Sequence, residues 1–294
     1  MTRAAGIDVG GTKFLGVVLA DSGEVVLELR RPTPQGNDAL INELIEFANE
    51  LAAFDPLGYD TLGVGVPGLV TRQGIIRASP NLVGAFDLAV GPRLSEALGR
   101  TVAVDNDATC AALAEWQLGA ARGFTDVIVV TLGTGIGGGI ISGGRLQHGA
   151  NGFAGEVGHM VVQPDGPPCP CGRRGCWERY ASGTGLQVLA GGRRGEDVVA
   201  AARAGDPHMV AVIDDFARWV ALGLVNLTNV LDPACIVLGG GLAADDDLFL
   251  PRIQQAFTAL LYSPEHRPHP ALRFAALAER AGAIGAALLP SAER

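Results

Sequence analysis

Runs of basic residues are missing from this sequence, and so are the patterns of fibrous or disordered chains. Its 22 Lys and Arg residues are outnumbered by 31 Asp and Glu, which gives a formal net charge of −9. An acidic chain without a basic run is poorly suited to bind nucleic acid or an anionic membrane. Its glycines follow no three-residue period, which excludes collagen, and a content of 48% hydrophobic residues excludes a disordered chain.

A signal peptide and a clear membrane span are also missing. The apolar stretch at the start of the chain is interrupted by Asp8, Gly10, Gly11 and Lys13, which does not suit a signal peptide. The uncharged run 127–144 approaches the roughly 20 residues of a membrane span. Its seven glycines favour two buried strands around a glycine loop instead. We therefore expect a soluble, cytoplasmic protein.

Glycine, in contrast, is abundant. It supplies 42 of 294 residues, about twice the usual share of roughly 7%. Proline is not raised with it, so this is no low-complexity composition. An excess of glycine in an apolar, globular chain indicates several places where the backbone turns tightly or approaches a ligand closely.

Apolar spacing along the chain predicts an alternation of strands and helices. We expect strands over 4–9, 14–19, 25–29, 61–66, 101–104, 127–131, 137–141 and 235–238, and helices over 38–54, 108–118, from 209 onwards and over 281–289. Asn37 or Asp38 is expected to cap the first helix, and Asn106 or Asp107 the second. Residues 127–141 repeat the design of residues 4–19, a strand, a glycine turn and a strand. No low-complexity linker divides the chain, so any domain boundary must be a hinge between packed lobes.

Three glycine clusters stand at strand ends. They are Asp8-Val9-Gly10-Gly11-Thr12-Lys13, Gly133-Thr134-Gly135 with the glycines that follow, and Gly239-Gly240-Gly241. Glycine turns let backbone N–H groups face phosphate oxygens, and Thr12 and Lys13 can add donors. One such turn is as readily a plain hairpin, but three together favour a nucleotide site. Neither of the common glycine motifs that open a helix is present.

A carboxylate follows the strand at 101–104. Asp107 stands where that strand meets a helix, next to Asn106. On its own this position favours a helix cap. The functional alternative is a base that accepts a hydroxyl proton in phosphoryl transfer, a reaction that depends on positioning more than on basicity. Asn106 can hydrogen-bond a sugar hydroxyl.

The cysteines divide into two kinds. Cys110 and Cys235 stand alone in apolar surroundings and are expected in the core, whereas Cys169, Cys171 and Cys176 fall within eight residues. With His159 they make a Cys3His set, which is typical of structural zinc. The alternative is three unligated thiols in a loop, but a Gly- and Pro-rich segment with little apolar content needs another source of order. His148 is the second choice for the fourth ligand. Zinc would fix the loop that presents Glu156 and Glu178.

These motifs together resemble the ROK family, which comprises bacterial repressors, open reading frames and sugar kinases within the actin-like ATPase group. The residues that carry the resemblance are Asp8 to Lys13, Asp105-Asn106-Asp107, Leu132 to Gly135, Gly155 to His159, Cys169 to Glu178 and Gly239 to Gly241. They span nearly the whole chain, and the zinc segment is the most specific. The family more often has a glutamate where Asp105 stands, so Asp105 is assigned no role.

The resemblance implies a fold of two α/β lobes of ribonuclease-H-like topology, with ligands in the cleft between them. The N-terminal lobe would cover residues 1–113, completed by a C-terminal helix at about 282–294, and the larger lobe residues 114–281 with the zinc loop. Asp8 to Lys13 and Gly133 to Gly135 would hold ATP phosphates, and Gly239 to Gly241 would border the adenosine. Asp107 would be the catalytic base. The sugar hydroxyls would be bound by Asn106, Glu156, His159 and Glu178, with Gly68 and Asn81 lining the pocket, and His159 would also bind zinc.

The activity implied by the resemblance is that of an ATP-dependent hexose kinase, first of all a glucokinase that makes glucose 6-phosphate. The alternatives are an N-acetylmannosamine or N-acetylglucosamine kinase and, in another class, a sugar sensor without catalysis. Mg²⁺ is expected with ATP, and a homodimer or a dimer of dimers is the expected assembly. The sequence Gly-Gly-Thr-Lys resembles that of ATP users rather than polyphosphate users. Only seven residues precede Asp8, so we expect no DNA-binding domain ahead of it.

Overall fold

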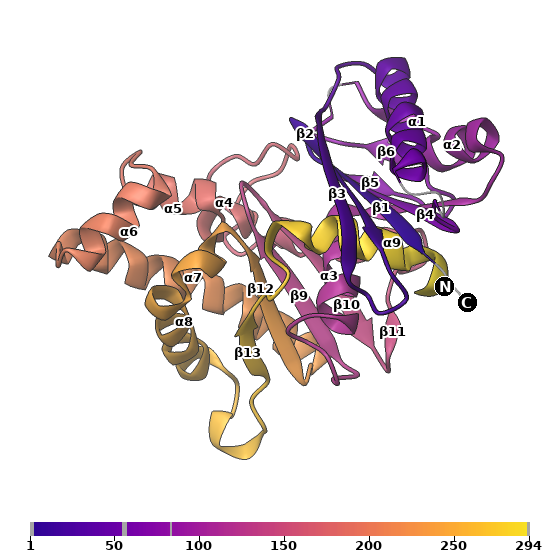
Figure 1. The fold of residues 1–294 in the computed structure, drawn as a ribbon. Helices are drawn as coiled ribbons and strands as arrows, with labels where there is room; N and C mark the ends of the chain where they lie inside the picture. Colours follow the sequence, from indigo (N-terminus) through magenta and orange to yellow (C-terminus); the bar gives the residue numbers. More distant parts are fainter. Residues whose placement is uncertain (1–2, 55–57, 83, 293–294) are drawn as a thin grey trace.

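The computed structural model describes residues 3–54, 58–82 and 84–292, and it contains two five-stranded sheets of the same design (Figure 1). The first has the order β3 (Val25–Pro32), β2 (Lys13–Leu19), β1 (Ala4–Val9), β4 (Thr61–Val66) and β8 (Val102–Asn106). The second has the order β11 (Arg145–Leu146), β10 (Ile136–Ser142), β9 (Val127–Leu132), β12 (Cys235–Gly240) and β13 (Ala271–Phe274). In each sheet an antiparallel meander extends three parallel strands. The repeat expected from residues 4–19 and 127–141 is confirmed.

The remaining elements cover these sheets. The helices are α1 (Asn37–Ala53), α2 (Val90–Leu98), α3 (Asp107–Gln117), α4 (Glu178–Ala181), α5 (Gly183–Leu189), α6 (Gly195–Arg203), α7 (Pro207–Leu231), α8 (Asp246–Leu260) and α9 (Ala281–Ala292). Short 3-10 turns are η1 (Val157–His159), η2 (Gly241–Asp245), η3 (Pro264–His266) and η4 (Ala278–Arg280). A small sheet holds β5 (Leu69–Val70), β6 (Ile76–Ala78) and β7 (Phe86–Leu88). The predicted α/β class is confirmed.

Helices α3 and α9 lie between the two sheets (Figure 1). A Cβ atom at Gly137 of β10 would stand 2.6 Å from the Ala108 methyl of α3, so the strand packs closely against this helix only because a glycine stands there. On the other side, Gly6 of β1 and Gly63 of β4 leave room for the backbone of α9. The C-terminal helix therefore packs on the first sheet. The predicted lobe boundaries at 113/114 and 281/282 remain a prediction, and residues 1–2, 55–57, 83 and 293–294 of that division lie outside the described residues.

Of the two helix caps predicted from the sequence, one is confirmed and one is wrong. Asn106 caps α3, because its side-chain oxygen accepts hydrogen bonds from the backbone N–H groups of Ala108 and Thr109. The cap expected at Asn37 or Asp38 is wrong: α1 begins after Gly36, which has no side chain to serve as a cap. The φ of 95° at Gly36 is a conformation that asparagine and aspartate adopt only at a cost, so the chain turns there by glycine geometry.

The second sheet is packed against α7, and Trp177 fills the space between them. Its indole is fully buried, and its Nε1–H donates to the carbonyl oxygen of Trp219 at 2.7 Å. Gly223 of α7 faces the indole so closely that a Cβ at that position would overlap the ring. Trp177 directly follows Cys176 and precedes Glu178, so this core packing fixes the position of a predicted zinc ligand and a predicted sugar ligand.

Gly223→Ala is expected to lower the free energy of unfolding by about 1–3 kcal/mol, because an extra methyl group in a packed core forces rings and backbone to shift. Urea unfolding followed by circular dichroism measures this loss. Gly195→Ala, at the start of α6, is the matched control, since a Cβ there meets only Leu186 at 3.8 Å. Equal stability of the Gly223 and Gly195 variants would contradict the close packing of Trp177 on α7.

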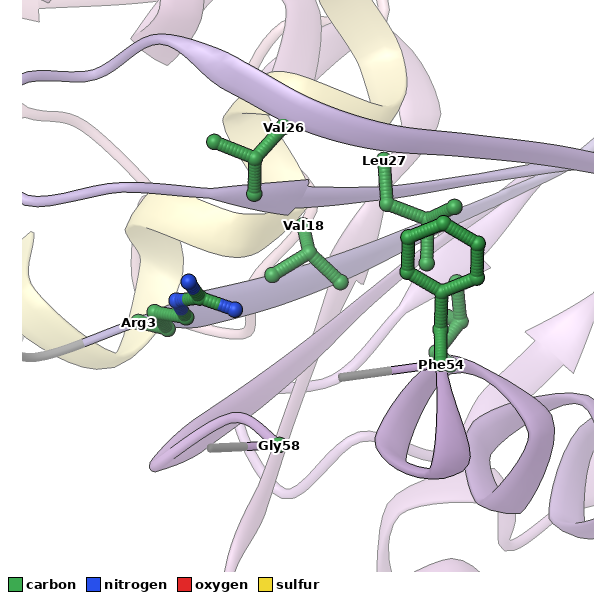
Figure 2. Close-up of a pocket in the computed structure, with 7 residues that line it drawn as sticks. Arg3, Val18, Val26, Leu27, Phe54 and Gly58 are labelled. Carbon is green, nitrogen blue, oxygen red and sulfur yellow. The ribbon is translucent and has the colours of Figure 1, made fainter. Parts of the chain in front are cut away.

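Two further features concern membrane-spanning helices and a surface hollow. No helix among the described residues is long and apolar enough to cross a membrane. A small hollow beside β2 and β3 is lined by Arg3, Val18 and Phe54 among others (Figure 2). Val18 pairs with Ala5 near the start of β1, so this hollow lies at the opposite end of the strand from Asp8. It therefore takes no part in the candidate site described below.

Candidate active site

The parallel strands of the first sheet bring three sequence-predicted segments to one edge. The strand register aligns Asp8 of β1 with Gly65 of β4, and Gly65 with Asp105 of β8. Just beyond these positions, the Asn106 side-chain amide donates to the carbonyl oxygen of Gly68 at 3.1 Å. Asp8, Gly68 and Asn106 therefore lie together at the carboxyl ends of β1, β4 and β8, where ligands bind in open parallel sheets.

Two aspartates, Asp8 and Asp107, lie near one glycine at this edge. A Cβ at Gly65 would lie 3.5 Å from Oδ1 of Asp8 and 3.6 Å from Cα of Asp107, so the two aspartates flank the same glycine. Burial and the nearby Asp107 raise the pKa of Asp8 to about 7, against the opposing charge of Lys13. Burial likewise raises the pKa of Asp107, although the backbone N–H of Ala108 donates to it at 2.9 Å. A carboxylate whose pKa is raised towards neutrality is better suited to accept a proton.

Asp107 occupies the first position of α3 and not its cap. Asn106 satisfies the first backbone N–H groups of the helix, which leaves the second oxygen of Asp107 without a capping duty. The cap interpretation of Asp107, favoured on sequence alone, is therefore wrong. The helix N-terminus still supplies a local positive potential, which favours negative charge at this place.

The first glycine turn closes next to these carboxylates. The N–H of Gly10 donates to the carbonyl oxygen of Lys13 at 2.9 Å, and the Thr33 hydroxyl donates to that of Gly10 at 2.6 Å. The Lys13 ammonium group is exposed and lies 3.4 Å from the Glu279 carboxylate. Gly11 and Asn81 line a shared hollow with residues 33–37. The structure thus places Asn81 beside the first turn.

The second and third glycine turns lie side by side on the second sheet. The register aligns Gly239 with Thr131 and Gly240 with Leu132, just before the turn at Gly133. That turn is held by the start of α5, because the carbonyl oxygen of Gly133 accepts a hydrogen bond from the Gly183 N–H at 2.8 Å. The Thr184 hydroxyl also donates to the Thr134 carbonyl at 2.8 Å. The predicted nucleotide residues of these two turns therefore share the carboxyl edge of β9 and β12.

Glu156, His159 and Glu178 form a compact polar group between these edges. The His159 ring lies 3.8 Å from Glu156 through Nε2 and 3.8 Å from Glu178 through Nδ1. Glu178 also accepts a hydrogen bond from the Ile136 N–H at 3.4 Å, just after the second glycine turn. Burial raises the pKa of Glu156, and the negative charges of Asp107 and Glu178 add to that rise while His159 opposes it. Asp107 is therefore near enough to interact electrostatically with this group.

The predicted zinc ligands converge. One ligand atom from each of His159, Cys169, Cys171 and Cys176 lies within 4.8 Å of the other three. The sulfurs of Cys171 and Cys176 are 3.6 Å apart, and Cys169 Sγ lies 3.8 Å from His159 Nδ1. Tetrahedral zinc with bonds near 2.3 Å separates its ligands by about 3.8 Å. The donor set and its spacing fit zinc, and the group touches the site because Cys169 Sγ also lies 2.9 Å from Glu178 Oε1.

Two residues depart from their sequence interpretation. His148, the second choice as a metal ligand, is not in the four-residue group, and its Nε2 lies 2.7 Å from Oδ2 of Asp105. Asp105, which was assigned no role, is buried beside the proposed base. The one sequence feature that could have identified Asp105 is its place in an Asp-Asn-Asp segment at a strand end. Its partner was not visible, because 43 residues separate the two.

Known proteins resemble the chain over nearly its full length. The model of the ROK family matches residues 4–293. A glucokinase of Streptomyces coelicolor is 35% identical over 98% of this chain and 97% of its own. An N-acetylmannosamine kinase of Escherichia coli is 32% identical over the whole of both chains. The crystal structure of a ROK family glucokinase from Streptomyces griseus, in complex with glucose and AMPPNP, superposes with a TM-score of 0.86 at 34% identity, over 98% of this chain and 99% of that one. The predicted actin-like ATPase fold is confirmed by this likeness.

Proposed function

Because the chain belongs to the ROK family, we propose that it is an ATP-dependent hexose kinase that phosphorylates the 6-hydroxyl of glucose. The observation that carries the proposal is the position of Asp107. This carboxylate opens α3 directly after the end of β8, burial raises its pKa, and its charge raises the pKa of Glu156. A sugar bound by Glu156, His159 and Glu178 would have its reacting hydroxyl next to a base.

In this proposal Asp107 accepts the proton of the 6-hydroxyl as that oxygen attacks the γ-phosphorus of ATP. Phosphoryl transfer requires the attacking and leaving oxygens to be held in line more than it requires a strong base. The backbone N–H groups of the turns at Gly10–Lys13 and Gly133–Gly135 would hold the phosphates, and Gly239–Gly241 would border the adenosine. Mg²⁺ would accompany ATP and neutralise charge on the phosphates.

Sugar recognition in this proposal rests on hydrogen bonds to the remaining hydroxyls. Asn106, Glu156, His159 and Glu178 bind them, and Gly68 and Asn81 line the pocket. A buried polar group left without a partner costs roughly 1–3 kcal/mol, so a wrong epimer is rejected by the bonds it fails to make. Zinc, held by His159 and the three cysteines, would keep Glu178 in place and would take no part in the chemistry.

An N-acetylhexosamine kinase is the second candidate, because the N-acetylmannosamine kinase of Escherichia coli is also similar to this chain over its whole length. A coupled ADP-release assay with ATP, Mg²⁺ and a panel of glucose, mannose, N-acetylglucosamine and N-acetylmannosamine separates the two. We expect glucose to give the highest kcat/KM. Preference for an N-acetyl sugar would transfer the proposal to the second candidate. Sugar binding without turnover of any panel member would instead indicate a sensor.

A further inference from the structure

His148 and Asp105 make a contact between the two sheets that the proposed reaction does not yet use. His148 follows β11 of the second sheet, whereas Asp105 lies in β8 of the first. The imidazole Nε2 stands 2.7 Å from Asp105 Oδ2, and the two side chains are 21% and 9% exposed. A carboxylate can only accept hydrogen bonds, so the imidazole N–H donates. A hydrogen bond in such a shielded place is electrostatically stronger than one exposed to water.

The second oxygen of Asp105 continues the connection towards the base. Oδ1 accepts a hydrogen bond from the backbone N–H of Asn106 at 2.7 Å. Asn106 in turn caps α3 and donates to Gly68. Its neighbour Asp107 opens that helix. One uninterrupted series of hydrogen bonds therefore leads from His148 to the backbone that carries Asp107.

His148 is also tied to the loop that carries Glu156. Its carbonyl oxygen accepts from the N–H of Ala154 at 3.1 Å, which closes residues 148–154 into a compact loop. Arg72, which follows β5 in the chain, donates to the carbonyl oxygen of Gly149 at 2.6 Å, so the loop has a second attachment to the N-terminal half of the chain. Gly155 and Glu156 follow directly. The loop is therefore held in place at the point where the proposed sugar ligand begins.

We propose that His148 is a positioning residue that sets the distance between the base Asp107 and the sugar ligand Glu156 through its hydrogen bond to Asp105. This rests on the proposed function of the site. His148 acts through Asp105 and is not one of the residues proposed to bind a substrate. Without the bond, the loop at 148–156 keeps its attachment through Arg72 and Gly149 but loses the one that leads to the Asp107 end of α3, so the two parts are less firmly held relative to each other. The hydroxyl group that accepts the phosphoryl group is then aligned with the base for a smaller fraction of the time.

The first test is the steady-state kinetics of His148→Ala, Asp105→Asn and the double variant with the preferred hexose. Asp105→Asn keeps the oxygen that accepts the Asn106 N–H and removes the negative charge. Each single variant is expected to lose about 10-fold in kcat, because small misplacements of reacting groups carry penalties of this order. The double variant is expected to lose about 10-fold as well, rather than about 100-fold, because both act through one contact. The KM for ATP is expected to stay unchanged.

His148→Gln and His208→Gln supply the controls. The glutamine amide in His148→Gln can donate to the same carboxylate oxygen, so this variant is expected to retain kcat within about threefold of wild type. His208 is exposed at the start of α7 and its replacement is expected to change nothing. Zinc content is expected to stay at the wild-type level in every variant, since His148 lies outside the ligand group. Multiplicative losses in the double variant, or an unchanged kcat in His148→Ala, would overturn the proposal.

A second measurement does not depend on catalysis. Hydrogen–deuterium exchange of peptides covering 104–112 and 146–156 is expected to quicken in His148→Ala and in Asp105→Asn, but not in His208→Gln. If the wild-type protein phosphorylated no hexose, the proposed function would fail, and this exchange experiment would still test the contact. Unchanged exchange in both segments would show that the pair holds nothing in place.

Discussion

Asp107→Asn is expected to lower kcat by about 10²–10⁴-fold while the dissociation constant for the sugar changes little. The loss is that of a general base, which contributes by this order. The amide has nearly the same shape as the carboxylate, and Asn106 rather than Asp107 caps α3, so the helix start is kept. Coupled kinetics gives kcat, and isothermal titration with the sugar alone gives the binding constant.

Asp215→Asn is the matched control for this experiment. Asp215 is exposed on α7, far along the chain from the strand ends of the first sheet, and the same loss of one charge there is expected to leave kcat unchanged. A wild-type rate in Asp107→Asn would remove Asp107 from the proposed mechanism. A rate loss together with a large loss of sugar affinity would assign it to binding.

The dependence of the reaction rate on pH is a second test of Asp107 as the base. Burial raises the pKa of Asp107 above the ordinary aspartate value. The base is active when ionised, so the rate falls as pH drops through this raised pKa. The neighbouring Asp8, with a pKa of about 7, titrates in the same site, so an acidic limb of the profile belongs to the pair.

Cys171→Ala is expected to abolish zinc binding and to lower kcat/KM for the sugar on the order of 100-fold. Three remaining ligands do not close a structural zinc site. Without the metal the loop at 160–178 loses its principal constraint, and Glu178, whose Oε1 lies 2.9 Å from Cys169 Sγ, loses its fixed position. A displacement of about 1 Å in a substrate-positioning group is enough for a loss of this order.

Inductively coupled plasma mass spectrometry on purified protein measures the metal. Arg173→Ala serves as control, because Arg173 is an exposed side chain in the same loop and lies outside the ligand group. It is expected to retain one zinc per chain and wild-type kinetics. Wild-type protein purified without zinc, yet active, would show that thiols alone order the loop.

Much of this site could be predicted from sequence because its parts are local patterns. The glycine turns, the Asp105-Asn106-Asp107 segment and the cysteine spacing are each contained in a short stretch of the chain. The two sheets follow from strand patterns of the same kind. That these segments lie together in the described structure is a result of the shared strand edges, which bring Asp8, Gly65 and Asp105 into one row.

What escaped prediction depends on contacts between distant segments. His148 and Asp105 are 43 residues apart, and nothing local to either marks the pair. The need for glycine at position 223 is not visible in the sequence either, because it comes from the Trp177 indole, 46 positions earlier in the chain, which a Cβ at Gly223 would overlap. Gly137 follows the glycine turn that the sequence assigns to phosphate binding. In the structure, a glycine is needed there because α3 packs directly against it.

The burial of Trp177 links the stability of the fold to the binding of a metal by the neighbouring cysteines. The indole belongs to the hydrophobic core of the second sheet, and it sits between Cys176 and Glu178. A metal held by the neighbouring cysteines would therefore bind the folded chain more tightly than the unfolded one, in which its ligands are not held together. By mass action, each tenfold rise of free zinc above its dissociation constant would then add up to about 1.4 kcal/mol to the stability of the fold. With zinc at this site, the melting temperature would be set partly by the zinc concentration around the protein.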